Sequence, residues 1–310
     1  MCGIVGLFFK NPALEPLLGE YFTAMLDCMS SRGPDSAGMA IYGDPAPEGA
    51  LKFSLQHRDS GFDWARLVAR LARFCESPAT FVAVSTHATV TIATDVPSVR
   101  RFLREQAPEI SLMGAGRRIE IFKEVGTPRS VMDRFDVAGM HGSHAIGHTR
   151  MATESAVTTA GSHPFSTGLD LCLVHNGSLS NHNRIRANLR RAGMEFHSDN
   201  DSEVAAGFLT HQLAGGATLP EALDAALREL DGFYTFAVGT GDGFAVLRDA
   251  VACKPAVMAE TGDYVAMASE YRSLAALPGI AHARLWEPEP ATVYSWQRDP
   301  ATAELCATTI

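Results

Sequence analysis

The chain begins with an uncharged apolar segment whose second residue is a cysteine. Residues 2–9 combine Cys2 and two glycines with Ile, Val, Leu and Phe. Such a run favours a strand buried on both faces, and its small residues suit a central strand beside an open cleft. The segment has neither the charged lead-in nor the small-residue cleavage site of an export signal. We therefore expect a buried strand from the first residues onward, in a chain located in the cytoplasm.

The composition permits a large core. The chain has 310 residues, of which 46% are hydrophobic and 20% charged, which is typical of one large domain or of one domain with a sizeable insertion. The net charge is −9, and no long basic run offers partners for phosphates. No apolar run approaches the length of a membrane span. We predict no nucleic-acid and no membrane partner. The densest basic stretch comprises Arg184, Arg186, Arg190 and Arg191. We interpret it as a solvated helix face rather than as a docking surface for an acidic protein.

Residues 51–143 differ from the rest of the chain in the pattern of elements that they predict. A stretch rich in Pro, Gly and acidic residues, 43–49, precedes them. Within them, patterns of apolar spacing, Val and Thr content and capping residues predict alternating helices and strands. The predicted elements are a helix at 62–74, a strand at 81–92, a helix capped by Asp95, a strand at 117–125 and a helix begun by Thr127 and Pro128. This order predicts a small α/β insertion.

Outside residues 51–143, strands gather toward both ends of the chain with helices between. The strand candidates are 2–9, 39–42, 145–149, 169–175, 233–240, 245–248, 256–260 and 264–268, and the helix candidates are 17–30, 183–192, 202–214 and 219–230. Two sheets packed face to face between helical layers would bury the apolar faces of all these elements. We therefore predict an α+β, four-layer αββα sandwich of two mainly antiparallel sheets. Residues 1–50 and 144–310 would form it, with 51–143 inserted.

Cys2 follows only the initiator Met. Removal of that Met would leave Cys2 with a thiol and a free α-amino group on one residue. The amine, with a reference pKa of about 8, can accept a proton near neutrality, and the thiolate is a strong nucleophile. A small apolar residue at the start of a strand is the alternative interpretation, and position alone favours it. The neighbouring Gly3, which permits close approach of a substrate, shifts the balance toward a nucleophile.

A second group of residues provides what amide hydrolysis needs. Asn176 and Gly177 could offer two converging hydrogen-bond donors to a developing oxyanion, although Asn-Gly alone is typical of a hairpin turn. Arg150 is suited to binding a carboxylate bidentately. Asp201 is suited to binding an ammonium group. A surface charge and a helix cap, respectively, are the alternatives for Arg150 and Asp201.

Six motifs in this order resemble the class II glutamine amidotransferases of the N-terminal nucleophile (Ntn) hydrolase superfamily. They begin at Cys2, Arg32, His148, His163, His175 and Asp201. Each is weak alone, and the ordered set is specific. The resemblance, which covers residues 2–42 and 144 to about 275, implies the αββα fold. It also implies that Cys2 is the nucleophile and its amine the base, and that Asn176 and Gly177 form the oxyanion hole.

The resemblance further implies a substrate pocket for the amino-acid end of glutamine. Arg150 and Asp201 would bind that end, Thr153 and His163 would lie in the pocket wall, and Arg32 would order the cysteine loop. Two positions depart from the family pattern. Met151 stands where an aromatic residue is common, and Glu154 where histidine is.

No synthetic domain accompanies the motifs, so we expect the released nitrogen to reach another chain in a hetero-oligomer. In size the chain resembles the A subunit of N-methylglutamate synthase (methylamine–glutamate N-methyltransferase) and related glutamate-synthase-like systems. The resemblance implies no cofactor in this chain, a flavin in a partner subunit, and glutamine or γ-glutamylmethylamide as substrate. Met151 in place of a bulky aromatic residue would leave room for the extra methyl group.

Three alternatives stay open at this point. The chain could be a non-catalytic structural or regulatory subunit of the same complex, which only Met151 and Glu154 support. It could be another Ntn hydrolase, such as a protease or acylase, which Arg150 and Asp201 oppose. A metal site at His141, His144 and His148, whose spacing would place them together on a helix, is not expected because glycines interrupt that stretch.

Overall fold

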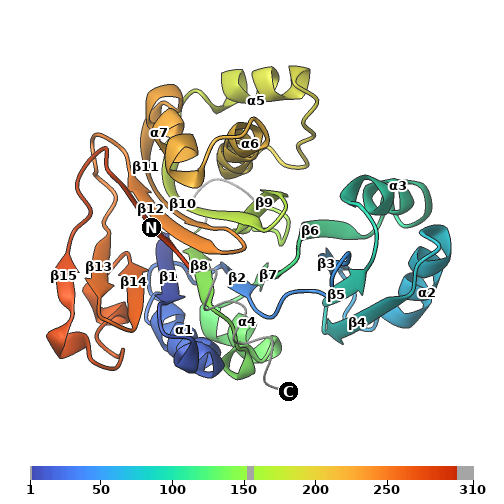
Figure 1. Cartoon of the computed structure of the whole chain (residues 1–310), viewed down its shortest axis with the longest axis horizontal. Helices are drawn as coiled ribbons and strands as arrows, with labels where there is room; N and C mark the ends of the chain where they lie inside the picture. Colours follow the sequence, from blue (N-terminus) through green and yellow to red (C-terminus); the bar gives the residue numbers. More distant parts are fainter. Residues whose placement is uncertain (1, 152–156, 299–310) are drawn as a thin grey trace.

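The computed structural model describes residues 2–151 and 157–298. Its main body contains two packed β-sheets, each covered on its outer face by helices (Figure 1). The seven-stranded sheet has the order β15 (Arg284–Trp286), β13 (Val257–Glu260), β14 (Tyr264–Ala268), β1 (Gly3–Phe9), β8 (His144–Arg150), β2 (Ser36–Tyr42) and β7 (Ile119–Val125). All its neighbouring strands are antiparallel. Strand β1 is therefore central, as the sequence predicts.

The second sheet has five strands and faces the first. Its order is β16 (Val293–Gln297), β12 (Gly243–Arg248), β11 (Gly232–Gly239), β10 (Leu171–Leu179) and β9 (Phe165–Gly168). Its outer face packs against α5 (His182–Arg191), α6 (Asp201–Ala214) and α7 (Leu219–Glu229). The outer face of the seven-stranded sheet packs against α1 (Leu18–Asp27) and α4 (Pro128–Arg134). The predicted four-layer αββα sandwich of two mainly antiparallel sheets is thus confirmed.

Alternation along β1 explains why this strand is apolar throughout. Ile4 and Phe8 lie in the core between the two sheets, whereas Val5 and Leu7 lie in the core under the helices. A strand between two apolar layers has no solvent-facing side. The first strand is accordingly buried at every position.

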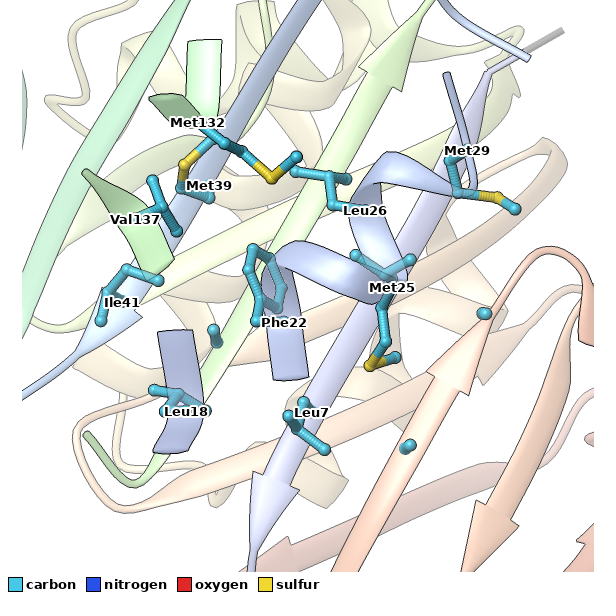
Figure 2. Close-up of a cluster of buried hydrophobic side chains, with 14 of the residues drawn as sticks. Leu7, Leu18, Phe22, Met25, Leu26, Met29, Met39, Ile41, Met132 and Val137 are labelled. Atoms are coloured by element: carbon cyan, nitrogen blue, oxygen red, sulfur yellow. The ribbon is translucent and has the colours of Figure 1, made fainter. Parts of the chain in front are cut away.

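Helix α1 covers the outer face of the seven-stranded sheet. Leu18, Phe22, Met25 and Leu26 recur at helical spacing and are fully buried. Figure 2 shows Phe22 in the middle of this cluster, with Leu7 of β1 and Met39 of β2 around it. Burying each such side chain contributes roughly 1.5–3 kcal/mol to folding. The cluster fixes α1 against the strand that carries Cys2.

Residues 51–116 form a separate four-stranded antiparallel sheet, on the right of Figure 1. Its strand order is β4 (Ala79–Val84), β5 (His87–Ile92), β3 (Leu51–Gln56) and β6 (Ser111–Gly116), and its helices are α2 (Trp64–Phe74) and α3 (Val96–Gln106). This β-α-β-β-α-β arrangement is ferredoxin-like. We call residues 51–116 the insertion sheet domain.

Strand β7 and helix α4 fall within the predicted insertion of residues 51–143 but belong to the main sandwich. Strand β7 pairs with β2 along seven positions, from Ser36↔Val125 to Tyr42↔Ile119. Helix α4 contributes Val131 and Met132 to the core under α1. Alternation can predict a strand at this place, but it does not reveal which sheet the strand joins.

The predicted elements also differ in detail from those observed. The single strand predicted at 81–92 is a hairpin, β4 and β5, with the turn between Val84 and His87. Asp95 caps α3 as predicted, since its side chain accepts a hydrogen bond from Ser98 N. Arg186, predicted on a solvated helix face, is buried and donates to Asn200 O. Within residues 2–151 and 157–298, no helix is long and apolar enough to cross a membrane.

Candidate active site

Cys2 immediately precedes the central strand β1 and borders a pocket. The pairing of β1 with β8 places Gly3 opposite Thr149 and Ile4 opposite His148. Since side chains alternate along a strand, Cys2 and His148 both point to the same side as Ile4, toward the second sheet. Cys2 is partly exposed and is not in a disulfide. Its position combines access from solvent with a rigid backbone.

A pocket of about 250 Å³ opens at Cys2. It is lined by Cys2, His148, Arg150, His163, His175, Asn176, Gly177, Asn200, Asp201, Ser202 and Lys254. A larger cavity, of about 340 Å³, lies between α3 and β9, and its lining includes neither cysteine nor histidine. We therefore assign the chemistry to the smaller pocket. It brings together Cys2, Asn176, Gly177, Arg150, His163 and Asp201, all predicted as site residues.

Asn176 and Gly177 lie inside strand β10, beside Cys2. The pairing of β10 with β11 continues to Leu179 opposite Gly232, so the hairpin-turn alternative for Asn-Gly is wrong. Asn176 Nδ2 donates to Cys2 O at 3.4 Å. Gly177 has φ +145°, and a Cβ there would lie 2.0 Å from Phe233 O. Only glycine fits this backbone, which places a strand N–H next to the Asn176 amide.

Arg32 holds the backbone of Cys2 from the other side. Its Nε donates to Cys2 O at 3.0 Å, and its Nη1 pairs with Glu270 Oε1 at 2.6 Å. The hydrogen bond from Arg32 lowers the pKa of Glu270, and Arg272 adds to that effect. The carbonyl of Cys2 thus accepts from both Arg32 and Asn176, which fixes the residue in place.

Arg150 and Asp201 also line the pocket. Arg150, the last residue of β8, donates from Nη1 to Gly161 O at 3.2 Å. Asp201 is the first residue of α6, and its Oδ2 accepts from Leu179 N at 2.8 Å. The cap of α6 is Asn200, whose side chain accepts from Ser202 N, so the helix-cap alternative for Asp201 is wrong. Thr153 and Glu154 lie outside the described residues.

Three buried histidines line the same pocket. The rings of His148 and His163 are stacked, with centroids 4.0 Å apart. His175 N donates to His163 Nδ1 at 3.2 Å, which leaves the proton of a neutral His163 on Nε2. That Nε2 then donates to Ser202 Oγ, 3.2 Å away. Ser202 Oγ also lies 2.9 Å from His175 Nδ1. The network links the histidines to the start of α6.

Burial keeps these three imidazoles neutral. Desolvation lowers the pKa of His148 to about 3 and that of His175 to about 4. Desolvation also lowers the pKa of His163 well below its usual value, and the neighbouring His148 and His175 act in the same direction. Nε2 of His148 and Nε2 of His175 have no hydrogen-bond partner among the described residues. Buried polar nitrogens of this kind are normally satisfied by a bound molecule or by water.

Five pocket residues were not among the predicted site residues. They are His148, His175, Asn200, Ser202 and Lys254. The first four adjoin predicted residues within the same motifs, which was the available signal. Lys254 comes from the loop after β12, where Arg248 Nη2 donates to Lys254 O at 3.0 Å. Its Nζ lies 4.9 Å from the centroid of the Phe233 ring.

The three histidines considered for a metal site do not lie together on a helix. His144 and His148 are in strand β8, and His141 Nε2 lies 2.8 Å from Asp44 Oδ2. Burial lowers the pKa of His144 to about 3, and its Nε2 lies 2.8 Å from Thr240 O. Within the described part of the chain, no group of three or more His, Cys, Asp or Glu could hold a metal ion.

The chain is similar to known amidotransferases. Residues 148–276 match the glutamine amidotransferase domain family. The glutamine amidotransferase-like protein GlxB of Rhizobium meliloti is 57% identical over 302 residues, which cover 97% of this chain and 100% of that protein. A putative glutamine amidotransferase of Methanothermobacter thermautotrophicus is 31% identical, over 95% of this chain and 99% of that protein.

Among solved structures, the fold is similar to that of glutamine phosphoribosylpyrophosphate amidotransferase from B. subtilis. The TM-score is 0.59 at 18% identity, with 96% of this chain and 50% of that chain covered. The match confirms the fold, and this chain spans half the length of that structure. The two full-length relatives show that the chain belongs to the class II glutamine amidotransferase family.

Proposed function

We propose that this chain is a glutaminase subunit that hydrolyses the side-chain amide of glutamine through a thioester on Cys2. The observation that carries the proposal is the meeting of Cys2 with Asn176 and Gly177 at one pocket, whose lining also includes Arg150 and Asp201. A nucleophile and two oxyanion donors face an anionic and a cationic anchor. This arrangement suits a free amino acid whose side chain ends in an amide.

In the proposed reaction, removal of residue 1 gives Cys2 a free α-amino group. This amine takes the thiol proton, and Sγ attacks the side-chain carbonyl carbon of glutamine. The oxyanion of the tetrahedral intermediate accepts hydrogen bonds from Asn176 Nδ2 and Gly177 N. Collapse of the intermediate breaks the C–N bond, and the amine returns its proton to the leaving ammonia. Water then hydrolyses the thioester to glutamate and restores the thiol.

The amino-acid end of the substrate determines orientation. Arg150 would bind the α-carboxylate of glutamine through its planar guanidinium group. Asp201 would bind the α-ammonium group, because its carboxylate is partly exposed to the pocket. His163 and Thr153 would complete the wall, and Arg32 would hold the Cys2 backbone. Lys254 adds a second positive charge to the pocket lining.

The nitrogen acceptor would be a partner synthase chain in a hetero-oligomer. We propose a glutamate-synthase-like partner that carries the flavin, of the kind found in N-methylglutamate synthase. The substrate would then be glutamine or γ-glutamylmethylamide, and the product ammonia or methylamine. The second substrate rests on the sequence argument that Met151 stands where an aromatic residue is common; Met151 directly follows Arg150 and is 45% exposed, but it is not among the residues that line the pocket. A comparison of kcat/KM for the two amides tests this, and a strong preference for glutamine would contradict it.

The test of the proposed function is intact-mass measurement after incubation with 6-diazo-5-oxo-norleucine, a glutamine-shaped electrophile. We expect loss of Met1 and one adduct, which Cys2→Ala abolishes. Cys253→Ala is the matched control, because Cys253 is an exposed free cysteine in the loop that carries Lys254. Its removal should leave the adduct in place. Retention of Met1 without any adduct, with partner chains present, would instead favour a non-catalytic structural or regulatory subunit.

A further inference from the structure

Lys123 of strand β7 is a buried charged residue that the proposed reaction does not use. It is 3% exposed, and no ion pair joins it to a carboxylate within residues 2–151 and 157–298. Its Nζ donates to three backbone carbonyls, of Ser162 at 2.8 Å, Pro164 at 3.2 Å and Ala160 at 3.5 Å. Burying an ammonium group is costly unless its donors are satisfied. Here the three donors of one lysine match three carbonyls.

These carbonyls belong to one short segment, residues 158–164, which also contacts the substrate pocket. Lys123 donates to the carbonyls of residues 160, 162 and 164. The carbonyl of Gly161, between the first two of these, accepts from Arg150 Nη1 at 3.2 Å. His163 lies in the same segment and stacks on His148. The 158–164 segment therefore positions both Arg150 and His163, and Lys123 holds it in place.

The next residue on β7 holds the same segment from its other side. Glu124 Oε1 accepts a hydrogen bond from Thr159 Oγ1. Glu124 Oε2 accepts from Thr86 Oγ1 of the insertion sheet domain at 2.9 Å. Adjacent residues of a strand point to opposite faces, and β7 is an edge strand. Lys123 and Glu124 thus hydrogen-bond to the segment from opposite faces of the sheet edge.

Close packing leaves the segment little room to shift. Strand β2 passes beside both Lys123 and the segment at Gly38. A Cβ on Gly38 would lie 2.1 Å from His163 O and 2.5 Å from Lys123 Cβ. Desolvation lowers the pKa of Lys123 to about 8, so the ammonium form still predominates at neutral pH.

We propose that Lys123 and Glu124 form a clamp that positions the 158–164 segment, and with it Arg150 and His163, for binding the amino-acid end of the substrate. Through the contact of Glu124 with Thr86, the clamp also links the insertion sheet domain to the pocket. Lys123 is in this sense a positioning residue. The inference rests on the proposed function, since it assumes that Arg150 binds the substrate carboxylate.

The test compares labelling of Cys2 by two reagents in the full chain. Diazo-oxo-norleucine carries an α-carboxylate and an α-ammonium group, whereas iodoacetamide carries neither. We expect Lys123→Met to raise the half-saturating concentration of diazo-oxo-norleucine by about tenfold or more, as expected for losing charged hydrogen bonds. The maximal labelling rate, and the rate with iodoacetamide, should change less than about twofold, because Cys2 itself is not moved.

Lys52→Met is the matched control. Lys52 Nζ pairs at 2.6 Å with Glu120 Oε1 of β7, the strand that also carries Lys123. Lys52 does not contact the 158–164 segment. We expect labelling by both reagents to match that of the unmodified chain. Thr86→Val removes the hydrogen bond from Thr86 Oγ1 to Glu124, together with the 3.0 Å contact of the same hydroxyl with His87 Nδ1. It should raise the half-saturating concentration by about threefold, as for one weakened hydrogen bond.

Two results would overturn the clamp. One is an unchanged half-saturating concentration of diazo-oxo-norleucine for the labelling of folded Lys123→Met. The other is an equal loss of labelling by both reagents, which indicates general misfolding rather than positioning. If Lys123→Met does not fold, Thr159→Val decides the question by the same criteria. Failure of the proposed function is distinguishable, because the unmodified chain would then show no saturable labelling of Cys2.

Discussion

Asn176 and Cys2 are joined by a hydrogen bond between the two sheets, with Asn176 Nδ2 3.4 Å from Cys2 O. Cys2 precedes the central strand of one sheet and Asn176 lies in a strand of the other. The contact keeps the amide donor next to the sulfur-bearing residue before any substrate arrives. Donors held in advance cost little reorganisation when the oxyanion forms.

Asn176→Ala should lower kcat for glutamine hydrolysis on the order of a hundredfold or more, because one oxyanion donor is lost. KM should change little, since Arg150 and Asp201 hold the other end of the substrate. Steady-state kinetics with glutamate detection measures both quantities. A variant that keeps kcat within threefold of the unmodified chain would remove Asn176 from the oxyanion site.

Gly177→Ala should destabilise the chain by more than the roughly 1–3 kcal/mol typical of a strained backbone residue. The φ of +145° disfavours any Cβ, and the Cβ would also lie 2.0 Å from Phe233 O. Gly193→Ala is the matched control, with φ +92° and nothing within 4 Å of its Cβ. Urea unfolding of both variants separates strain from collision. Equal losses of stability would contradict the collision with Phe233.

Arg32→Lys should lower kcat about tenfold with a smaller change in KM, because lysine has no planar fork to reach both Cys2 O and Glu270. Loss of the Arg32 contact lets Cys2 shift relative to the bound amide. Arg272→Lys is the control. Arg272 also pairs with Glu270, with Nε and Oε2 2.6 Å apart, but its side chain is 50% exposed. We expect near-normal kinetics from it, and an equal loss in both variants would argue against a specific role for Arg32.

Stability should fall steeply as the pH drops below about 6.5. Burial lowers the pKa of His87 and His175 to about 4 and that of His144 and His148 to about 3. Below the unfolded pKa the unfolded chain binds protons that the folded chain does not. Each such histidine therefore removes about 1.4 kcal/mol of unfolding free energy per pH unit, until the pH reaches its folded pKa.

The pH dependence of urea unfolding between pH 7 and 5 measures this effect. His144→Gln should make the dependence shallower, because one buried imidazole is gone and His144 lies away from the pocket. His211→Gln, at an exposed position of α6, should leave it unchanged. A dependence that is equally steep in all three proteins would show that other groups cause the acid sensitivity.

Several features follow from local chemistry, and the sequence alone determined them. The uniformly apolar residues 3–9 require a strand with apolar layers on both faces, and β1 is central and buried. Asp95 and Thr127 cap helices because their side chains reach backbone N–H groups three residues ahead. The ordered motifs indicated the family, and six of the eight predicted site residues line one pocket.

Only the tertiary structure decided which distant segments meet. The alternation of apolar and polar residues along strand β7 would suit either sheet. Its pairing with β2 is what places Lys123 next to the 158–164 segment. The orientation of His163 depends on His175 N and Ser202 Oγ, which come from two other elements. Asp201 lies one residue after the helix cap, so its carboxylate is directed to Leu179 N. Local patterns specify each element and its faces, whereas partner and register depend on packing across the whole chain.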